Sequence, residues 1–139
     1  MQSIFILGGW DGYQLPFHKS ISVFNPDGAP VHLKSGPWPT LITARDAMTT
    51  AFIEGELLAM GGHDGANYLA SCEIYSASSP GNGKYKCWTA IGALEGSRAF
   101  HASASLGRTA FCFGGQGSKT GPPGEYGKAV AVSLLVVEL

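Results

Sequence analysis

Pairs of adjacent glycines occur at three places in this sequence, and the distance between successive pairs is constant. The doublets Gly8-Gly9, Gly61-Gly62 and Gly114-Gly115 begin at positions 8, 61 and 114, so they are 53 residues apart each time. A chain with 20 glycines in 139 residues forms doublets by chance, but chance does not space them equally. The constant period predicts a chain built from repeated structural units.

Two other residue types follow the same period. Arg45 and Arg98 are also 53 residues apart, and each precedes the first glycine of the next doublet by 16 residues. Trp38 and Trp88 follow the preceding doublet after 29 and 26 residues, a drift that loops of unequal length would produce. The repeat therefore has several marker positions in a fixed order.

Within one period the sequence favours β-strands. Four runs of strand length, rich in apolar, aromatic and β-branched residues, are separated by turn signals; they cover residues 47–53, 56–62, 71–77 and 87–94. A helix over residues 47–60 is the alternative, but Thr49, Thr50 and the Glu54-Gly55 pair weaken it and favour a hairpin. A repeat of about 50 residues with four strands predicts an all-β fold of propeller-like blades, each a four-stranded antiparallel meander.

Composition narrows the function classes. The formal net charge is −1, which indicates neither nucleic-acid binding nor attraction to an anionic membrane. The longest apolar stretch, residues 129–139, is too short to cross a bilayer. Cys72, Cys87 and Cys112 lack CxxC spacing, which argues against a disulfide framework or zinc site and favours a reducing, cytoplasmic location. Cys72 and Cys112 fall within expected strands, where buried thiols are usual.

The ordered markers resemble the kelch family of β-propeller repeats. The matching features are the glycine doublets, the Asp-Gly pair after two of them, and the aromatic, tryptophan and arginine positions Phe24, Tyr75, Trp38, Trp88, Arg45 and Arg98. The resemblance implies blades with strands A (inner) to D (outer), in which the doublet closes strand B. It places strands B to D of one blade in residues 1–43, a complete blade in 44–96, and strands A to C of another in 97–139.

This division gives about 2.6 units, whereas closed propellers have roughly four to eight blades. The sequence is therefore expected to be a fragment of a longer propeller, a chain that assembles with further chains, or an open arc; the fragment is favoured. Loops 76–86 and 116–129 are longer than the family usually shows, and their role is open.

By resemblance, the chain is expected to be a protein-interaction module that binds a protein or peptide through its B-to-C and D-to-A loops. Ubiquitin-ligase adaptors and cytoskeletal proteins are examples of such modules. The candidate partner-binding residues are Arg45, Arg98, Tyr13, Asn67 and Tyr68. For the two arginines, bridging of adjacent blades through backbone carbonyls is an equal alternative. Asp11 and Asp64 are expected to form turns.

No catalytic constellation is evident. The four histidines, at positions 18, 32, 63 and 101, lack metal-ligand spacing and are expected to be surface or turn residues. The sequence therefore predicts no enzyme activity, metal or cofactor, and it predicts that Trp38 and Trp88 belong to the core. The alternative is a fragment of a kelch-fold enzyme, resembling a copper oxidase or a sugar isomerase, because some enzymes use this fold.

Overall fold

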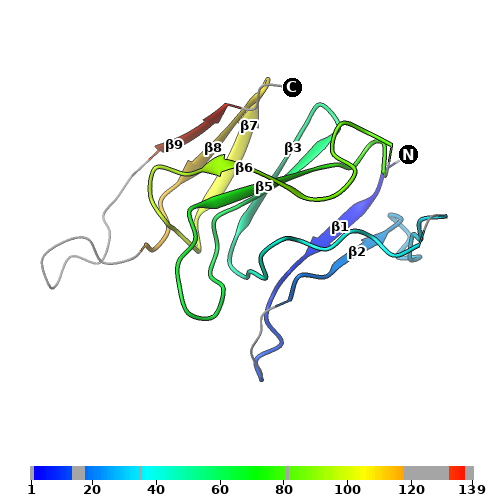
Figure 1. Cartoon of the computed structure of the whole chain (residues 1–139), viewed down its shortest axis with the longest axis horizontal. Coiled ribbons are helices and arrows are strands. Elements are labelled where there is room, and N and C mark those ends of the chain that lie inside the picture. Colours follow the sequence, from blue (N-terminus) through cyan, green and yellow to red (C-terminus); the bar gives the residue numbers. More distant parts are fainter. Residues whose placement is uncertain (1, 14–17, 35, 81, 118–131, 137–139) are drawn as a thin grey trace, which may run out of the picture.

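The computed structural model describes residues 2–13, 18–34, 36–80, 82–117 and 132–136, the last of these by their backbone alone. These parts of the chain contain no helix and form three antiparallel sheets (Figure 1). The strands are β1 (Ile4–Leu7), β2 (Ile21–Phe24), β3 (Thr49–Ile53), β4 (Glu56–Met60), β5 (Ser71–Ser76), β6 (Thr89–Ala93), β7 (Ala102–Leu106), β8 (Thr109–Phe113) and β9 (Val132–Val136). The expected all-β class is confirmed.

The central sheet is a meander in the order β3-β4-β5-β6. Its strands lie within the four runs expected from the sequence. Strands β3 and β4 are joined at Glu54 and Gly55, whose φ angles of +49° and +91° are typical of the two-residue turn that matches the twist of a hairpin. The segment that offered a helical alternative is thus a hairpin, with Ile53 paired to Glu56.

The two outer sheets have fewer strands. Strand β1 pairs with β2, whereas β7, β8 and β9 form the third sheet. No strand forms in the described residues between Phe24 and Thr49, although three strands, B to D, were expected in residues 1–43. Instead, the Trp38 indole donates to the Val31 carbonyl over 2.9 Å, and its ring meets Phe5 edge-on at 5.7 Å. The assignment of strand letters and blade boundaries stays a prediction.

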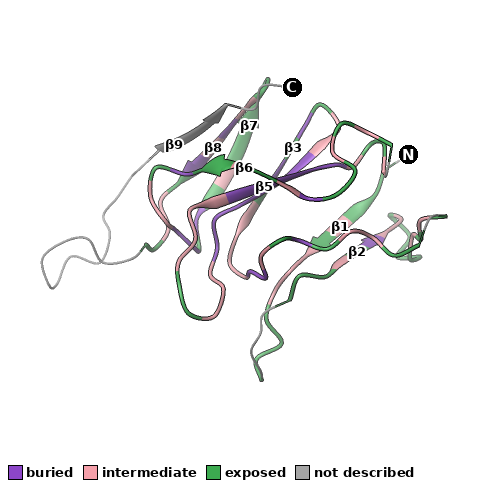
Figure 2. Ribbon diagram, viewed as in Figure 1, coloured by how far each residue is buried: buried purple, intermediate pink, exposed green. Residues whose placement is uncertain are grey.

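Each face of the central sheet contributes to a separate hydrophobic core, and β5 is buried along most of its length (Figure 2). Leu57, Ala59 and Tyr75 pack with Trp88 and Leu41 on the side of the first sheet. The other face packs against the third sheet through the second cluster, which comprises Ala51, Ile53, Leu58, Met60, Cys72, Ile74, Leu94, Ala110 and Cys112. Burial from both sides explains why β4 is apolar at successive positions rather than alternate ones.

The three cysteines are free. Cys72 and Cys112 are buried in the second cluster, whereas Cys87 is exposed. Burial in apolar surroundings raises the pKa of Cys72 to about 11, and it also raises the pKa of Cys112. The two buried thiols are therefore protonated at neutral pH and serve as small apolar side chains.

Candidate functional site

The first two glycine doublets lie where one sheet meets the segment that opens the next. The Gly9 amide donates to the Arg45 carbonyl over 2.9 Å, and the Gly62 amide donates to the Arg98 carbonyl over 2.8 Å. These hydrogen bonds are equivalent under the 53-residue repeat. Each one joins a doublet at the end of a strand to the arginine that precedes the following sheet, so it crosses from one sheet to its neighbour.

The first glycine of the doublet allows the two backbones to approach. A Cβ atom on Gly8 would lie 2.3 Å from the Arg45 carbonyl oxygen, and one on Gly61 would lie 2.6 Å from that of Arg98. The φ angles, +60° and +63°, also lie in the left-handed region that glycine adopts without strain. The repeated doublet therefore has a physical cause, which is close backbone contact between sheets.

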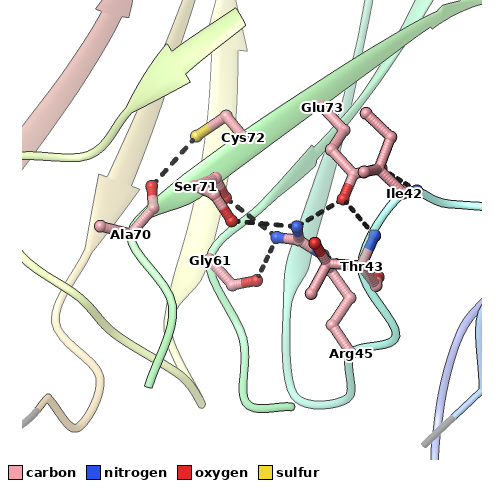
Figure 3. A network of polar contacts seen from close by, with 8 residues as sticks. All are labelled: Ile42, Thr43, Arg45, Gly61, Ala70, Ser71, Cys72 and Glu73. Carbon is pink, nitrogen blue, oxygen red and sulfur yellow. Dashed lines mark hydrogen bonds and ion pairs between the residues drawn. The ribbon is translucent and has the colours of Figure 1, made fainter. Parts of the chain in front are cut away.

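The side chain of Arg45 turns into the central sheet (Figure 3). Its Nη1 donates to the carbonyls of Gly61 and Ser71 over 2.7 and 2.9 Å. Its Nη2 donates to the Ser71 hydroxyl over 3.1 Å and forms an ion pair with Glu73 at 2.5 Å. Arg45 is 0% exposed. The guanidinium group therefore joins the ends of β4 and β5 to the segment that precedes β3.

The carboxylate of Glu73, which pairs with Arg45, binds three neighbouring groups. Its two oxygens accept hydrogen bonds from the backbone amides of Ile42 and Thr43 over 2.7 and 3.1 Å. One oxygen also binds Arg45. Because Glu73 is 2% exposed, its charge depends on these donors. Sequence reasoning missed Glu73, since a single glutamate in an apolar strand carries no periodic signal.

Arg98 repeats part of this arrangement. Its Nη1 donates to the Gly114 carbonyl over 3.1 Å, and its Nε donates to the Gly96 carbonyl over 3.3 Å. Arg45 makes the corresponding bonds to Gly61 and Thr43. Both guanidinium groups thus bind backbone carbonyls, and those that Arg45 binds belong to the central sheet and to the segment before it. Bridging of adjacent blades by these side chains stays a prediction. Contact of either guanidinium group with a partner stays a prediction.

The Asp-Gly pairs form turns. Asp64 Oδ1 accepts from the amides of Ala66 and Asn67 over 2.9 and 2.7 Å, and these hydrogen bonds, the Ala66 bond foremost, lower the pKa of the carboxyl group. Asp11 accepts in the same way from the Tyr13 amide over 3.0 Å. Both carboxylates therefore accept hydrogen bonds from backbone amides of their own turns.

The candidate side chains on these turns differ in exposure. Tyr13 is 91% exposed, and Asn67 is also exposed. Tyr68 is half-buried, with its ring edge-on to His63 at 5.1 Å. The turns after β1 and β4 lie along the lower edge of the sheets in Figure 1. Backbone pairing of Asp46 with His63 shows that the segment before β3 reaches the same edge.

Two exposed aromatic residues at this edge were missed. Trp10, 54% exposed, stands between a doublet and its turn; the run GGWDGY was itself the available signal. Phe100 is 69% exposed, has a φ of +56°, and donates its amide to the Ala47 carbonyl over 2.9 Å. It is 53 residues after Ala47, whose φ is +46°. No sequence signal marked this left-handed position, which glycine does not occupy.

A hollow opens at the same edge between the first and central sheets. Its volume is about 240 Å³, and it is lined by Phe5, Leu7, Gly9, Asp46, Ala47, Met48 and Thr50. Among the described residues, nothing hydrogen-bonds to Asp46 Oδ1, although that atom is buried. The hollow is therefore lined by apolar side chains together with Asp46 and Thr50.

His101 contradicts the expectation that the histidines lie at the surface or in turns. It is 8% exposed, and its Nε2 lies 3.0 Å from the Thr49 hydroxyl. Nothing in the described parts hydrogen-bonds to its buried Nδ1. Burial, and secondarily the charge of Arg98, lowers its pKa. His101 is 53 residues after Met48, so it occupies a core position of the repeat.

This burial predicts a pH dependence of stability. The folded chain holds the His101 proton less tightly than the unfolded chain does, so the free energy of unfolding falls as the pH drops below the unfolded pKa of about 6.5. Replacing His101 with methionine, the residue at the equivalent position 48, should remove the part of the pH dependence that comes from His101. Urea unfolding at pH 7.5 and 5.0 tests it: the wild-type chain should lose more stability on acidification than His101→Met. An equal loss in both would contradict the assignment.

Within the parts of the chain that are described, no group of three or more His, Cys, Asp or Glu side chains is placed to hold a metal ion. None of the described residues forms a helix long and apolar enough to span a membrane. Residues 118–129 of the long loop at 116–129 lie outside the described residues, and so do residues 14–17 and residue 81 of the loop at 76–86.

Comparison with known proteins gives one positive result. Residues 44–79 match the kelch motif, a stretch that contains Arg45, the doublet Gly61-Gly62, and strands β3 to β5. No curated protein matches the chain. The chain therefore contains a kelch motif, and its all-β sheets are consistent with part of a β-propeller.

Proposed function

We propose that the chain is a protein-interaction module that binds a protein or peptide along the edge where the doublets, their turns and the arginine-bearing segments meet. The observation that carries this proposal is the exposure of Tyr13, Trp10 and Phe100 at that edge. Exposed aromatic side chains supply much of the binding energy in protein interfaces, because each offers a large apolar area at low entropic cost. The kelch motif supports the same class of function.

The hollow suggests which part of a partner would be anchored. Asp46 is the charged residue among those that line the hollow, beside the apolar side chains of Phe5, Leu7 and Met48. A lysine or arginine side chain would pair its cationic end with this carboxylate and lay its methylene groups against the apolar walls. We therefore favour a partner that presents a basic residue next to apolar ones.

Two more specific functions, in a ubiquitin-ligase adaptor or in a cytoskeletal protein, are part of this proposal as well. Recognition of a substrate for a ubiquitin ligase and binding of a cytoskeletal protein both require only that the edge bind another protein. The net charge of −1 supports a protein partner over a nucleic acid. Free cysteines support a cytoplasmic location.

The test compares variants of the proposed edge with a control at a distant exposed site. Proteins retained from a lysate by the immobilised chain are quantified by mass spectrometry, and the retained protein is then purified and titrated. Tyr13→Ala and Phe100→Ala should each weaken binding about tenfold or more, as expected for aromatic anchors. Lys86→Ala, at an exposed loop position, should bind as the unmodified chain does. Equal binding by all variants would contradict the proposal.

A further inference from the structure

The long loop at 76–86, whose role the sequence leaves open, leads from β5 toward β6. Its ends are joined by two hydrogen bonds: the Ser76 amide donates to the Tyr85 carbonyl over 3.3 Å, and the Tyr85 amide donates to the Ser76 hydroxyl over 2.8 Å. The Ser78 amide donates to the Gly55 carbonyl over 3.0 Å. The loop therefore lies beside the β3–β4 turn, at the opposite ends of the strands from the turns after β1 and β4 (Figure 1).

Ser79 is an exposed serine of this loop, and Pro80 follows it directly. No other serine or threonine in the sequence precedes a proline. Proline at this position has no amide hydrogen and a fixed φ, and one class of serine/threonine protein kinases selects its acceptor hydroxyl by that following proline. The Ser79 hydroxyl group therefore has the local sequence and the exposure that such a kinase requires.

The backbone around Ser79 is held by bonds that an exposed loop can break. The Ser79 carbonyl accepts hydrogen bonds from the amides of Asn82 and Gly83 over 3.0 and 2.7 Å, which close a turn outside the three sheets. Local opening of exposed loop segments has a low free energy. Ser79 is three residues after Ser76, so an extended chain carries it about 10 Å from that end of the loop. The fold can thus present Ser79 to a kinase while its sheets stay intact.

The same turn places a positive charge next to the Ser79 backbone. The hydrogen bond from Gly83 to Ser79 brings the following residue, Lys84, beside Ser79. Lys84 and Lys86 are both exposed, and the loop at 76–86 contains no acidic residue. A phosphate group carries a charge of about −1.5 to −2 at neutral pH, which would neutralise the two lysines. The loop is therefore suited to bind a phosphate on its own serine.

We propose that Ser79 is the phosphorylation site of a proline-directed protein kinase and that Lys84 pairs with the resulting phosphate. In the transfer, the Ser79 hydroxyl oxygen bonds to the γ-phosphorus of ATP, the bond from that phosphorus to its bridging oxygen breaks, and ADP leaves. A base of the kinase takes the hydroxyl proton. The charge-assisted pair between the phosphate and Lys84 then holds the turn closed.

Mass spectrometry of the folded chain, after incubation with ATP and a panel of purified proline-directed kinases, tests the site. Phosphate should appear at Ser79, and Ser79→Ala should accept none. Ser78→Ala, a control at the neighbouring exposed serine, should react as fast as the unmodified chain. Pro80→Ala should react about tenfold more slowly or less, as expected when one specific contact with the enzyme is lost.

Three results would overturn the proposed site: no modification by any kinase of the panel, modification at Ser78 in place of Ser79, or an undiminished rate for Pro80→Ala. Circular dichroism verifies that each variant is folded. Because the loop lies away from the edge proposed to bind a partner, none of these results depends on that binding.

Amide hydrogen exchange measured by NMR tests the pairing with Lys84. Phosphorylation should slow exchange of the Gly83 amide about twofold or more, as expected for an ion pair that holds an exposed turn closed. The slowing should be absent in phosphorylated Lys84→Ala and present in phosphorylated Lys86→Ala, the matched control. Exchange that phosphorylation leaves unchanged, or a slowing that persists in Lys84→Ala, would overturn the pairing.

Discussion

Replacement of Arg45 with alanine is expected to lower the free energy of unfolding by about 3–5 kcal/mol, the cost of breaking a buried ion pair from one side. The change leaves the carboxylate of Glu73, 2% exposed, without its cation. It also removes the donors that serve the carbonyls of Gly61 and Ser71. Uncompensated buried polar groups of this kind are among the few causes of very large effects.

Urea unfolding followed by circular dichroism measures this loss. Arg108, a half-exposed arginine 3.7 Å from Glu54, supplies the control, and Arg108→Ala should change stability by no more than about 0.5 kcal/mol. The double variant Arg45→Met with Glu73→Leu should recover only the part of the loss that comes from the unpaired charge, since the Gly61 and Ser71 carbonyls and the Ile42 and Thr43 amides then lack their partners. A cost for Arg45→Ala as small as that of Arg108→Ala would contradict the structural role of the Arg45 side chain.

Replacement of Gly62 with alanine is expected to cost about 3 kcal/mol or more. The φ of Gly62 is +101°, and an added Cβ would lie 2.5 Å from the Asp46 carbonyl oxygen and 3.0 Å from Met48 Cβ. Backbone strain alone accounts for about 1–3 kcal/mol. The clash with backbone adds to this, because the sheet and the segment before it would have to separate.

The repeat supplies a matched control for this substitution. Gly9 is the equivalent second glycine, with a φ of +107°, but a Cβ there would meet nothing within 4 Å. Gly9→Ala should therefore carry the backbone strain without the clash, and its cost should be clearly smaller than that of Gly62→Ala. Equal costs would show that the close contact at Gly62 has no energetic weight.

The sequence predicted the architecture well because its strongest signals mark backbone geometry. The doublets predicted repeated units, and the structure shows why: Gly9 and Gly62 make equivalent hydrogen bonds to the next arginine carbonyl. The turn at Glu54-Gly55 was predictable for the same reason, since a two-residue hairpin requires positive φ at both positions. Local backbone demands of this kind are visible in residue type and spacing.

Contacts between residues far apart in the sequence were harder to predict from it. A fixed spacing showed that Arg45 and Arg98 matter, but it gave no information on whether their side chains face outward or inward. The inward choice depends on Glu73 and on the carbonyls of Gly61 and Ser71, which come together only after the strands pair. His101 was misjudged because its burial follows from a core position that methionine occupies one repeat earlier.

The central claim is that each of the first two doublets joins its own sheet to the next through backbone contact with the following arginine. Scalar couplings across hydrogen bonds, measured by NMR on the labelled chain, detect this contact between individual atoms. The predicted result is a coupling from the Gly9 nitrogen to the Arg45 carbonyl carbon and an equivalent coupling from Gly62 to Arg98. If neither coupling is present and both amides exchange with solvent as fast as in an unfolded chain, the claim is contradicted.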